Sequence, residues 1–234
     1  MPISRHLPAR RHLQLFVALG LASALCLGLS LVRIWYSDTR LYLFLNWNLF
    51  LAWVPLFLAW LLWYFDARRP RPRLVMAALL GGWLLFFPNS PYLVSDLIHL
   101  APRDNVPLWY DAIMLFAFAW NGLMLGFLAL WLVHQLVADW FGQVTGWLMV
   151  FATMTATGFG IYLGRFQRWN SWDLLVDPVG LLRNIAVYVT NPLDHPRTVA
   201  VTLLFAGFLT VAYLTLTVLP AALRVESRQR ERVL

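Results

Sequence analysis

The sequence predicts an all-α membrane protein with six transmembrane helices, and three observations support that prediction. Of its 234 residues, 61% are hydrophobic and only 12% are charged, whereas soluble domains average about 25% charged residues. Runs of about 20 mostly apolar residues, the length that a helix needs to cross a bilayer, recur along the chain. The arginines cluster in short segments between these runs. Because the length suits one helical bundle, we expect a single membrane domain over residues 1–234.

Charged, aromatic or proline-containing segments separate the six expected spans. The spans cover residues 12–34, 41–64, 74–88, 108–136, 143–163 and 198–219. The first run is longer than the 7–15 apolar residues of a signal peptide, so we interpret it as an uncleaved span. Its end, at Arg33, Trp35 and Tyr36, is interpreted as an interfacial belt. Cys26 lies inside this span and is expected to be a packing residue.

Polar residues inside the other spans are expected to find partners within the protein. Pro55 removes a backbone hydrogen bond from the second span, and a nearby group is expected to take up the freed carbonyl. Asn121 lies deep in the fourth span, where a hydrogen bond to a neighbouring helix is expected. Pairs of glycines four residues apart, such as Gly122 and Gly126, allow helices to approach closely.

A short helix is expected between the fifth and sixth spans. Asp177 followed by Pro178 is the pattern of an N-cap and a first helical residue. Four apolar side chains then recur on one face: Leu181, Leu182, Ile185 and Val189. The segment 178–189 is therefore predicted to be a helix that lies along the membrane interface.

The net charge of +7 comes from 18 arginines and no lysine. These arginines lie beside apolar spans, as topology signals do, so nucleic acid is not expected as a partner. They concentrate before residue 12, in residues 66–73 and in the tail 220–234, which six spans place on one side of the membrane. The positive-inside rule makes that side cytoplasmic. Both termini are therefore expected in the cytoplasm, and the polar segments 89–107 and 165–197 outside.

Residues 86–99 interrupt an apolar run with two prolines and several polar side chains. We expect the chain to break at Pro88 and to continue along the outer membrane surface. Asp96 and His99 are three residues apart, so in a helix they would share a face and could bind a metal or transfer a proton. Asp111 begins the next span and is expected to approach them. Ionisable groups beside a span are costly, so Asp96, His99 and Asp111 are the candidate catalytic residues.

The second polar segment supplies candidate ligands for an anion. The guanidinium group suits bidentate phosphate binding, so Arg165 and Arg168 are predicted to hold an anionic group. Tryptophans beside them could stack on a sugar or a lipid headgroup. The candidate substrate-binding residues are Asn89, Arg165, Arg168, Trp169, Asn170 and Asp173.

Each candidate also has a structural interpretation, which the sequence leaves open. The Asp–His pair could cap a helix end, and Asn89, between two prolines, could satisfy the broken backbone. Arg165 and Arg168 could pair with nearby aspartates, and the tryptophans could belong to an interfacial belt. The spacing matches no zinc signature, so no metal site is predicted, and no cofactor is identified.

Several motifs carry a family resemblance. They read FPNSPYLVSDLIHL at 87–100, PLWYD at 107–111, FAWNG at 118–122, GFGIYLGRF at 158–166 and RWNSWD at 168–173. These motifs resemble the signature of a bacterial membrane-protein family catalogued as domain of unknown function 1361. The likeness covers most of the chain from the second span onward. The resemblance implies an integral bacterial membrane protein and brings with it no activity and no catalytic residue.

The sequence thus predicts a multi-pass protein of the bacterial inner membrane with a polar, extracytoplasmic-facing pocket. The first hypothesis is binding or processing of a lipid or envelope precursor with an anionic headgroup. The alternatives are a small-solute transporter or channel, which needs a polar path through the bundle, and a non-catalytic scaffold for other membrane proteins. Whether the protein is an enzyme stays open, and the bilayer is the one partner that the composition identifies.

Overall fold

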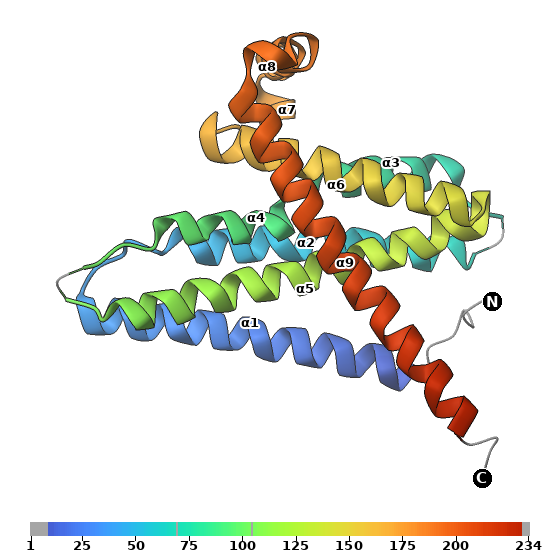
Figure 1. Cartoon of the computed structure of the whole chain (residues 1–234), viewed down its shortest axis with the longest axis horizontal. Helices are drawn as coiled ribbons and strands as arrows, with labels where there is room; N and C mark the ends of the chain where they lie inside the picture. Colours follow the sequence, from blue (N-terminus) through green and yellow to red (C-terminus); the bar gives the residue numbers. More distant parts are fainter. Residues whose placement is uncertain (1–8, 69, 104, 231–234) are drawn as a thin grey trace. The chain divides into compact units, whose positions relative to one another are not determined.

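A computed structural model describes residues 9–68, 70–103 and 105–230, and within these ranges the chain is helical with no strand. The helices and 3₁₀ turns are α1 (Ala9–Ser37), α2 (Phe44–Asp66), α3 (Arg73–Phe86), α4 (Asn89–Ser95), η1 (Asp96–His99), α5 (Leu108–Phe141), α6 (Gln143–Phe166), α7 (Asp173–Val176), α8 (Pro178–Thr190), η2 (Pro192–Asp194) and α9 (Pro196–Arg230). The predicted all-α fold class is confirmed (Figure 1).

Six helical segments of the described chain are long and apolar enough to cross a membrane. They cover Gln14–Ser37, Phe44–Asp66, Arg73–His99, Leu108–Phe141, Gln143–Phe166 and Pro196–Thr217. Many of their large apolar side chains are exposed, such as Leu21 at 67% and Val211 at 64%. Apolar side chains on all faces of a long helix are typical of a membrane span. The prediction of a polytopic membrane protein with six spans is therefore confirmed.

The third span runs further than the sequence indicated. Phe87 and Pro88 keep helical φ and ψ values between α3 and α4, so the segment continues to His99. Ser90 and Leu93 are fully buried and Asp96 is 1% exposed. The expected course along the membrane surface is corrected: the segment continues the third span, and its buried residues, from Ser90 to Asp96, pack against the protein, whereas His99 is exposed. Proline fits the start of a helix as well as a break, because its φ is already helical.

The helices form two compact units, residues up to Val133 and residues from His134 onward, and α5 contributes to both. In the first unit, α2 packs against α3 and α4. The Ser90 hydroxyl donates to the Ala52 carbonyl at 2.7 Å, beside the turn that Pro55 interrupts. A Cβ on Gly122 would lie 2.5 Å from the Ser90 carbonyl oxygen, so this glycine allows α5 to approach α4 closely. The single domain expected from the sequence stays a prediction.

In the second unit, α6 packs along α9. A Cβ on Gly158 would overlap the Thr202 carbonyl oxygen, so the two backbones meet there. His134, in the last part of α5, lies with its Nδ1 3.1 Å from the Tyr213 hydroxyl. The tail predicted over 220–234 is helical to Arg230, and its side chains lie outside the described residues.

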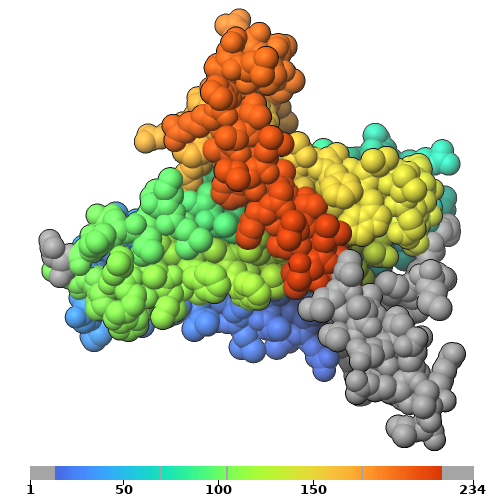
Figure 2. All heavy atoms as spheres, viewed as in Figure 1, coloured from blue at the N-terminus to red at the C-terminus, as the bar shows by residue number. Residues whose placement is uncertain are grey.

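The predicted interfacial helix is α8. Asp177 is its N-cap and accepts a hydrogen bond from the Gly180 N–H at 2.9 Å, as the sequence predicted. Leu181 is buried at 7% exposure, whereas Leu182 and Val189 are 57% and 63% exposed. The surface of this helix appears in orange in Figure 2. It therefore presents an apolar face outward, as an interfacial helix does.

Candidate functional site

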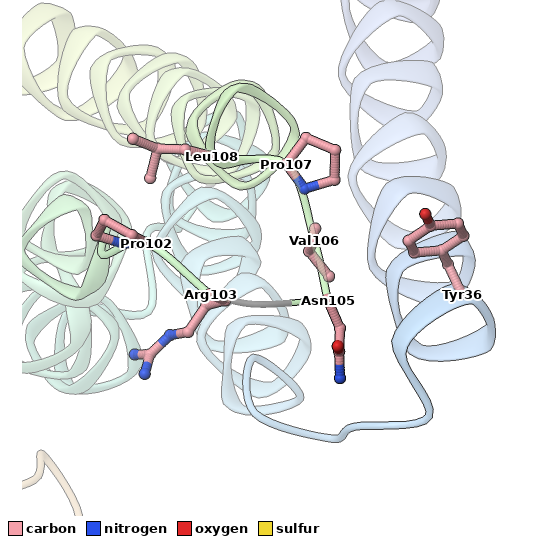
Figure 3. A pocket seen from close by; sticks show the side chains of 7 residues that line it. All are labelled: Tyr36, Pro102, Arg103, Asn105, Val106, Pro107 and Leu108. Carbon is pink, nitrogen blue, oxygen red and sulfur yellow. The ribbon is translucent and has the colours of Figure 1, made fainter.

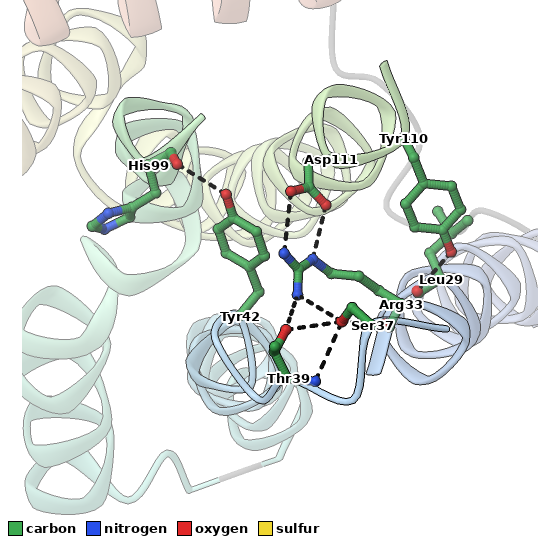
Figure 4. A network of polar contacts seen from close by, with 8 residues as sticks. All are labelled: Leu29, Arg33, Ser37, Thr39, Tyr42, His99, Tyr110 and Asp111. Atoms are coloured by element: carbon green, nitrogen blue, oxygen red, sulfur yellow. Dashed lines mark hydrogen bonds and ion pairs between the residues drawn. The ribbon is translucent and has the colours of Figure 1, made fainter. Parts of the chain in front are cut away.

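A buried ion pair joins the end of α1 to the beginning of α5. The Arg33 guanidinium donates from Nε to Asp111 Oδ1 at 2.8 Å and from Nη2 to Oδ2 at 3.3 Å (Figure 4). The two side chains are 2% and 1% exposed. This two-bond geometry matches the planar fork of the guanidinium to the carboxylate. Asp111, a candidate catalytic residue, is thus held and neutralised by Arg33.

Side chains of the loop between α1 and α2 complete the surroundings of Arg33. Its Nη1 donates to Thr39 Oγ1 at 2.9 Å and to Ser37 Oγ at 3.5 Å. The guanidinium carbon lies 4.5 Å from the centroid of the Tyr42 ring, a cation–π contact. The Tyr42 hydroxyl donates to the main-chain carbonyl of His99 at 2.9 Å. Tyr42 therefore connects the ion pair to the end of the third span.

The pKa of Tyr42 is raised above its ordinary value. Burial is the main cause, because it disfavours the phenolate, and the negative charge of Asp111 adds to it. The positive charges of Arg103 and Arg33 oppose the shift. The hydroxyl consequently keeps its proton at neutral pH and remains a hydrogen-bond donor.

Asp96 and His99 have different surroundings. Asp96 is 1% exposed and accepts a hydrogen bond from Asn48 Nδ2 at 3.0 Å, which ties the third span to α2. The side chain of His99 is exposed, and its ring meets the ring of Phe44 edge-on at 5.2 Å between centroids. Figure 4 shows the imidazole directed away from Asp111. These surroundings favour a structural role for Asp96, whereas the imidazole of His99 lies at the surface.

An open cavity of about 360 Å³ lies at the same end of this unit (Figure 3). Its lining residues are Tyr36, Pro102, Arg103, Asn105, Val106, Pro107 and Leu108. Arg103 and Asn105 are exposed and offer a cation and an amide, while Tyr36 and Leu108 offer apolar surface at 64% and 44% exposure. A guanidinium and an amide beside apolar surface suit an anionic group on an apolar stem.

Asn89 lies on α4, and its side-chain amide donates to the Phe86 carbonyl at 2.9 Å. The structural interpretation of this residue, that it satisfies backbone groups at the proline break, is therefore confirmed. Its predicted role in substrate binding stays a prediction.

The remaining candidates follow α6 in the second unit. Arg168 has a left-handed φ of 62°, which is uncommon outside glycine, and the Trp169 N–H bonds to the Leu163 carbonyl at 3.1 Å. Asp173 accepts from the main-chain N–H of Asn170 at 2.6 Å and from its amide at 3.4 Å. Arg168 is exposed and Arg165 is half-buried. Asn170 and Asp173 thus shape the turn that carries the Arg168 side chain at the surface.

Sequence reasoning missed Arg33, Tyr42 and Arg103 as members of the site. The interpretation of Arg33 as a belt residue is wrong, because its side chain is 2% exposed. Arg33 shares a helical face with Ser23 and Ser30, a spacing that indicates a buried polar stripe. His134 was also missed, although an ionisable residue inside an apolar run is itself a signal.

Among the described residues, no three His, Cys, Asp or Glu side chains lie close enough together to hold a metal ion. A family model described as "Protein of unknown function (DUF1361)" matches residues 47–212, more than half of the chain. No curated protein and no solved structure matches the chain.

Proposed function

The chain belongs to DUF1361, a family of proteins of unknown function, and is a multi-pass membrane protein. From the geometry of the first unit we propose a role in ligand binding. It binds an anionic headgroup, of a lipid or of an envelope precursor, on the extracytoplasmic side of the bacterial inner membrane. The site is the cavity lined by Tyr36, Arg103 and Asn105.

The arginine distribution supports this orientation. The segment from Asp66 to Arg73 joins α2 to α3 and contains four arginines. The segments at the other ends of the spans, between α1 and α2 and between η1 and α5, contain one arginine each. Short loops rich in arginine stay in the cytoplasm. The cavity, which lies between the arginine-poor ends, therefore opens outward.

The observation that carries the proposal is the contrast between two arginines at this end of the first unit. Arg33 is buried and neutralised by Asp111. Arg103 is exposed and lines the cavity together with Asn105. Among the described lining residues Arg103 is therefore the cation, and its guanidinium group suits bidentate binding of a phosphate or carboxylate.

Binding fits this geometry better than acid–base catalysis does. Asp111 is engaged by Arg33 and Asp96 by Asn48, so both carboxylates serve the packing of helices. A general acid or base needs to reach a proton of the substrate. Among the candidate catalytic residues, His99 is the one whose side chain is at the surface.

Arg165 and Arg168, after α6, are proposed as a second set of contacts for the same class of ligand. Arg168 is exposed, and its left-handed backbone is held by the closure of the helix end. That the segments 89–107 and 165–197 converge on one ligand stays a prediction from the sequence.

Native mass spectrometry of the purified protein tests the proposal. Phosphatidylglycerol, a polyprenyl phosphate and phosphatidylcholine are added separately, so the result also indicates the source of the headgroup. We expect the anionic lipids to bind more tightly, and Arg103→Gln to weaken their binding about tenfold, as loss of a charge-assisted hydrogen bond does.

Arg40→Gln is the matched control. It removes the same charge from an exposed position in the loop between α1 and α2, away from the cavity lining. It should leave binding unchanged. Equal binding of phosphatidylglycerol and phosphatidylcholine to the unmodified protein, or equal losses in both variants, would overturn the proposal.

A further inference from the structure

One buried face of α1 is polar from Ser23 to Arg33. Its side chains follow a helical spacing and are at most 8% exposed: Ser23, Cys26, Ser30 and Arg33. This face is directed at α5, because Arg33 pairs with Asp111 and the Asn121 amide donates to Ser23 Oγ at 2.8 Å. These six residues make up what we call the α1–α5 seam.

Two buried polar atoms of the seam have no hydrogen-bond partner among the described residues, Ser30 Oγ and Asn121 Oδ1. Both side chains are 1% exposed. Ser23 Oγ accepts two hydrogen bonds, from Asn121 and from Trp53 Nε1 at 3.0 Å, so its own proton still needs an acceptor. Each buried group left unsatisfied costs about 1–3 kcal/mol, which protein interiors normally avoid.

Hydroxyl groups elsewhere in the helices solve this problem locally. Ser37 and Thr155 donate to the carbonyl four residues earlier, at 2.8 and 2.9 Å. Ser30 lacks this bond. Its hydroxyl is therefore available to a partner that lies in the seam itself.

We propose that the α1–α5 seam binds water, which enters beside the Arg33–Asp111 pair and reaches Asn121 near the middle of the span. Water supplies what the seam lacks: a donor for Asn121 Oδ1 and a partner for the Ser30 hydroxyl. Between Asn121 and Val133, the buried side chains of α5 are apolar, including Leu125, Ala129 and Leu130, all fully buried. The bound water therefore extends no further than Asn121, where the packing becomes apolar.

Cys26, the single cysteine of the chain, lies in the seam and reports its hydration. Methyl methanethiosulfonate is small and uncharged, so it reaches thiols through lipid, but it reacts with the thiolate, which forms in water. The control is Leu25→Cys in a Cys26→Ser background. Leu25 is the neighbouring residue, at about the same depth, and its side chain is 59% exposed.

Intact-mass spectrometry of the protein in vesicles follows the reaction. We expect Cys26 to react at least about tenfold faster than the cysteine at position 25. Ser30→Ala, which removes one of the water partners, should slow the reaction of Cys26. Equal or slower reaction of Cys26 in the unmodified protein would overturn the proposal.

A charged, impermeant methanethiosulfonate added from one side shows which end of the seam is open. Reaction from the side of Arg33 is the expected result. This inference stands on the first unit alone and is independent of the proposed ligand. Loss of lipid selectivity would overturn the proposed function but not the hydrated seam. Equal or slower reaction of Cys26 would overturn the hydrated seam but not the proposed function.

Discussion

The Arg33 guanidinium and the Asp111 carboxylate form a two-bond ion pair between α1 and α5, at 2.8 and 3.3 Å, with both side chains almost fully buried. The effect of each residue on stability depends on the presence of the other. Removal of one leaves the partner as an unpaired buried charge, whereas removal of both leaves an apolar contact. The pair therefore couples the first span to the start of the fourth.

Asp111→Asn should destabilise the protein by about 3–5 kcal/mol, because Arg33 stays buried without its counterion. The double substitution Arg33→Met with Asp111→Leu should recover most of that loss. Thermal unfolding in detergent, followed by intrinsic fluorescence, measures both effects. Arg40→Met, at an exposed position, is the control. A single substitution as stable as the unmodified protein would show that the pair does not hold the helices.

Gly122→Ala should destabilise the first unit, since the new Cβ would lie 2.5 Å from the Ser90 carbonyl oxygen and 2.7 Å from a methyl group of Leu93. Gly28→Ala is the matched control, because a Cβ there has no neighbour within 4 Å. The control should be neutral or gain up to about 1 kcal/mol from helix propensity. Equal melting temperatures for the two variants would contradict the close approach of α4 and α5.

The raised pKa of the Tyr42 hydroxyl predicts that the protein loses stability at alkaline pH. Burial and the charge of Asp111 raise the pKa of Tyr42 in the folded protein. In the unfolded chain the pKa of tyrosine is about 10. Above about pH 10 the unfolded chain releases a proton that the folded chain keeps, so stability falls as pH rises toward the folded-state pKa. Tyr42→Phe lacks this contribution.

The measurement is the difference in melting temperature between the unmodified protein and Tyr42→Phe as a function of pH. The difference should be constant below about pH 9. Above about pH 10 the melting temperature of the unmodified protein should fall relative to that of Tyr42→Phe. The other tyrosines are common to both proteins, so their titration cancels. A difference that does not change with pH would contradict the burial of the Tyr42 hydroxyl.

Asp177→Ala should loosen the start of α8, because it removes the acceptor for the Gly180 N–H. Loss of an N-cap costs about 1 kcal/mol, which corresponds to about fivefold faster exchange of the first-turn amides. Hydrogen–deuterium exchange over residues 178–190 measures this. Asp194→Ala, an exposed aspartate of η2 that caps no helix with its side chain, should leave the exchange unchanged. Equal exchange in both variants would argue against the cap.

The spans could be predicted from the sequence because hydrocarbon allows few alternatives to an apolar helix. The partner of Asn121 followed from the same reasoning: a buried amide in a span needs a polar group on another helix, and Ser23 of α1 supplies it. The N-cap of α8 followed from the Asp–Pro pattern alone. In each case one local rule decides the outcome.

The course of residues 87–99 could not be predicted in this way. Pro88 and Pro91 look like helix breakers in the sequence, but each stands where a helical φ is needed. The partner of Arg33 was equally out of reach, because the spacing of Arg33 from Ser23 and Ser30 indicates a polar face of α1 but not which helix that face meets. That choice is made by tertiary packing, since an arginine at the end of a span reads the same whether it faces water or a carboxylate.

The most direct test of an outward-facing anion site is the sidedness of the two polar segments. Asn105→Cys and Leu182→Cys, each in a Cys26→Ser background, are treated with an impermeant maleimide in right-side-out membrane vesicles. We predict that both cysteines are labelled in intact vesicles. Labelling of either cysteine only after the vesicles are broken would contradict an extracytoplasmic site.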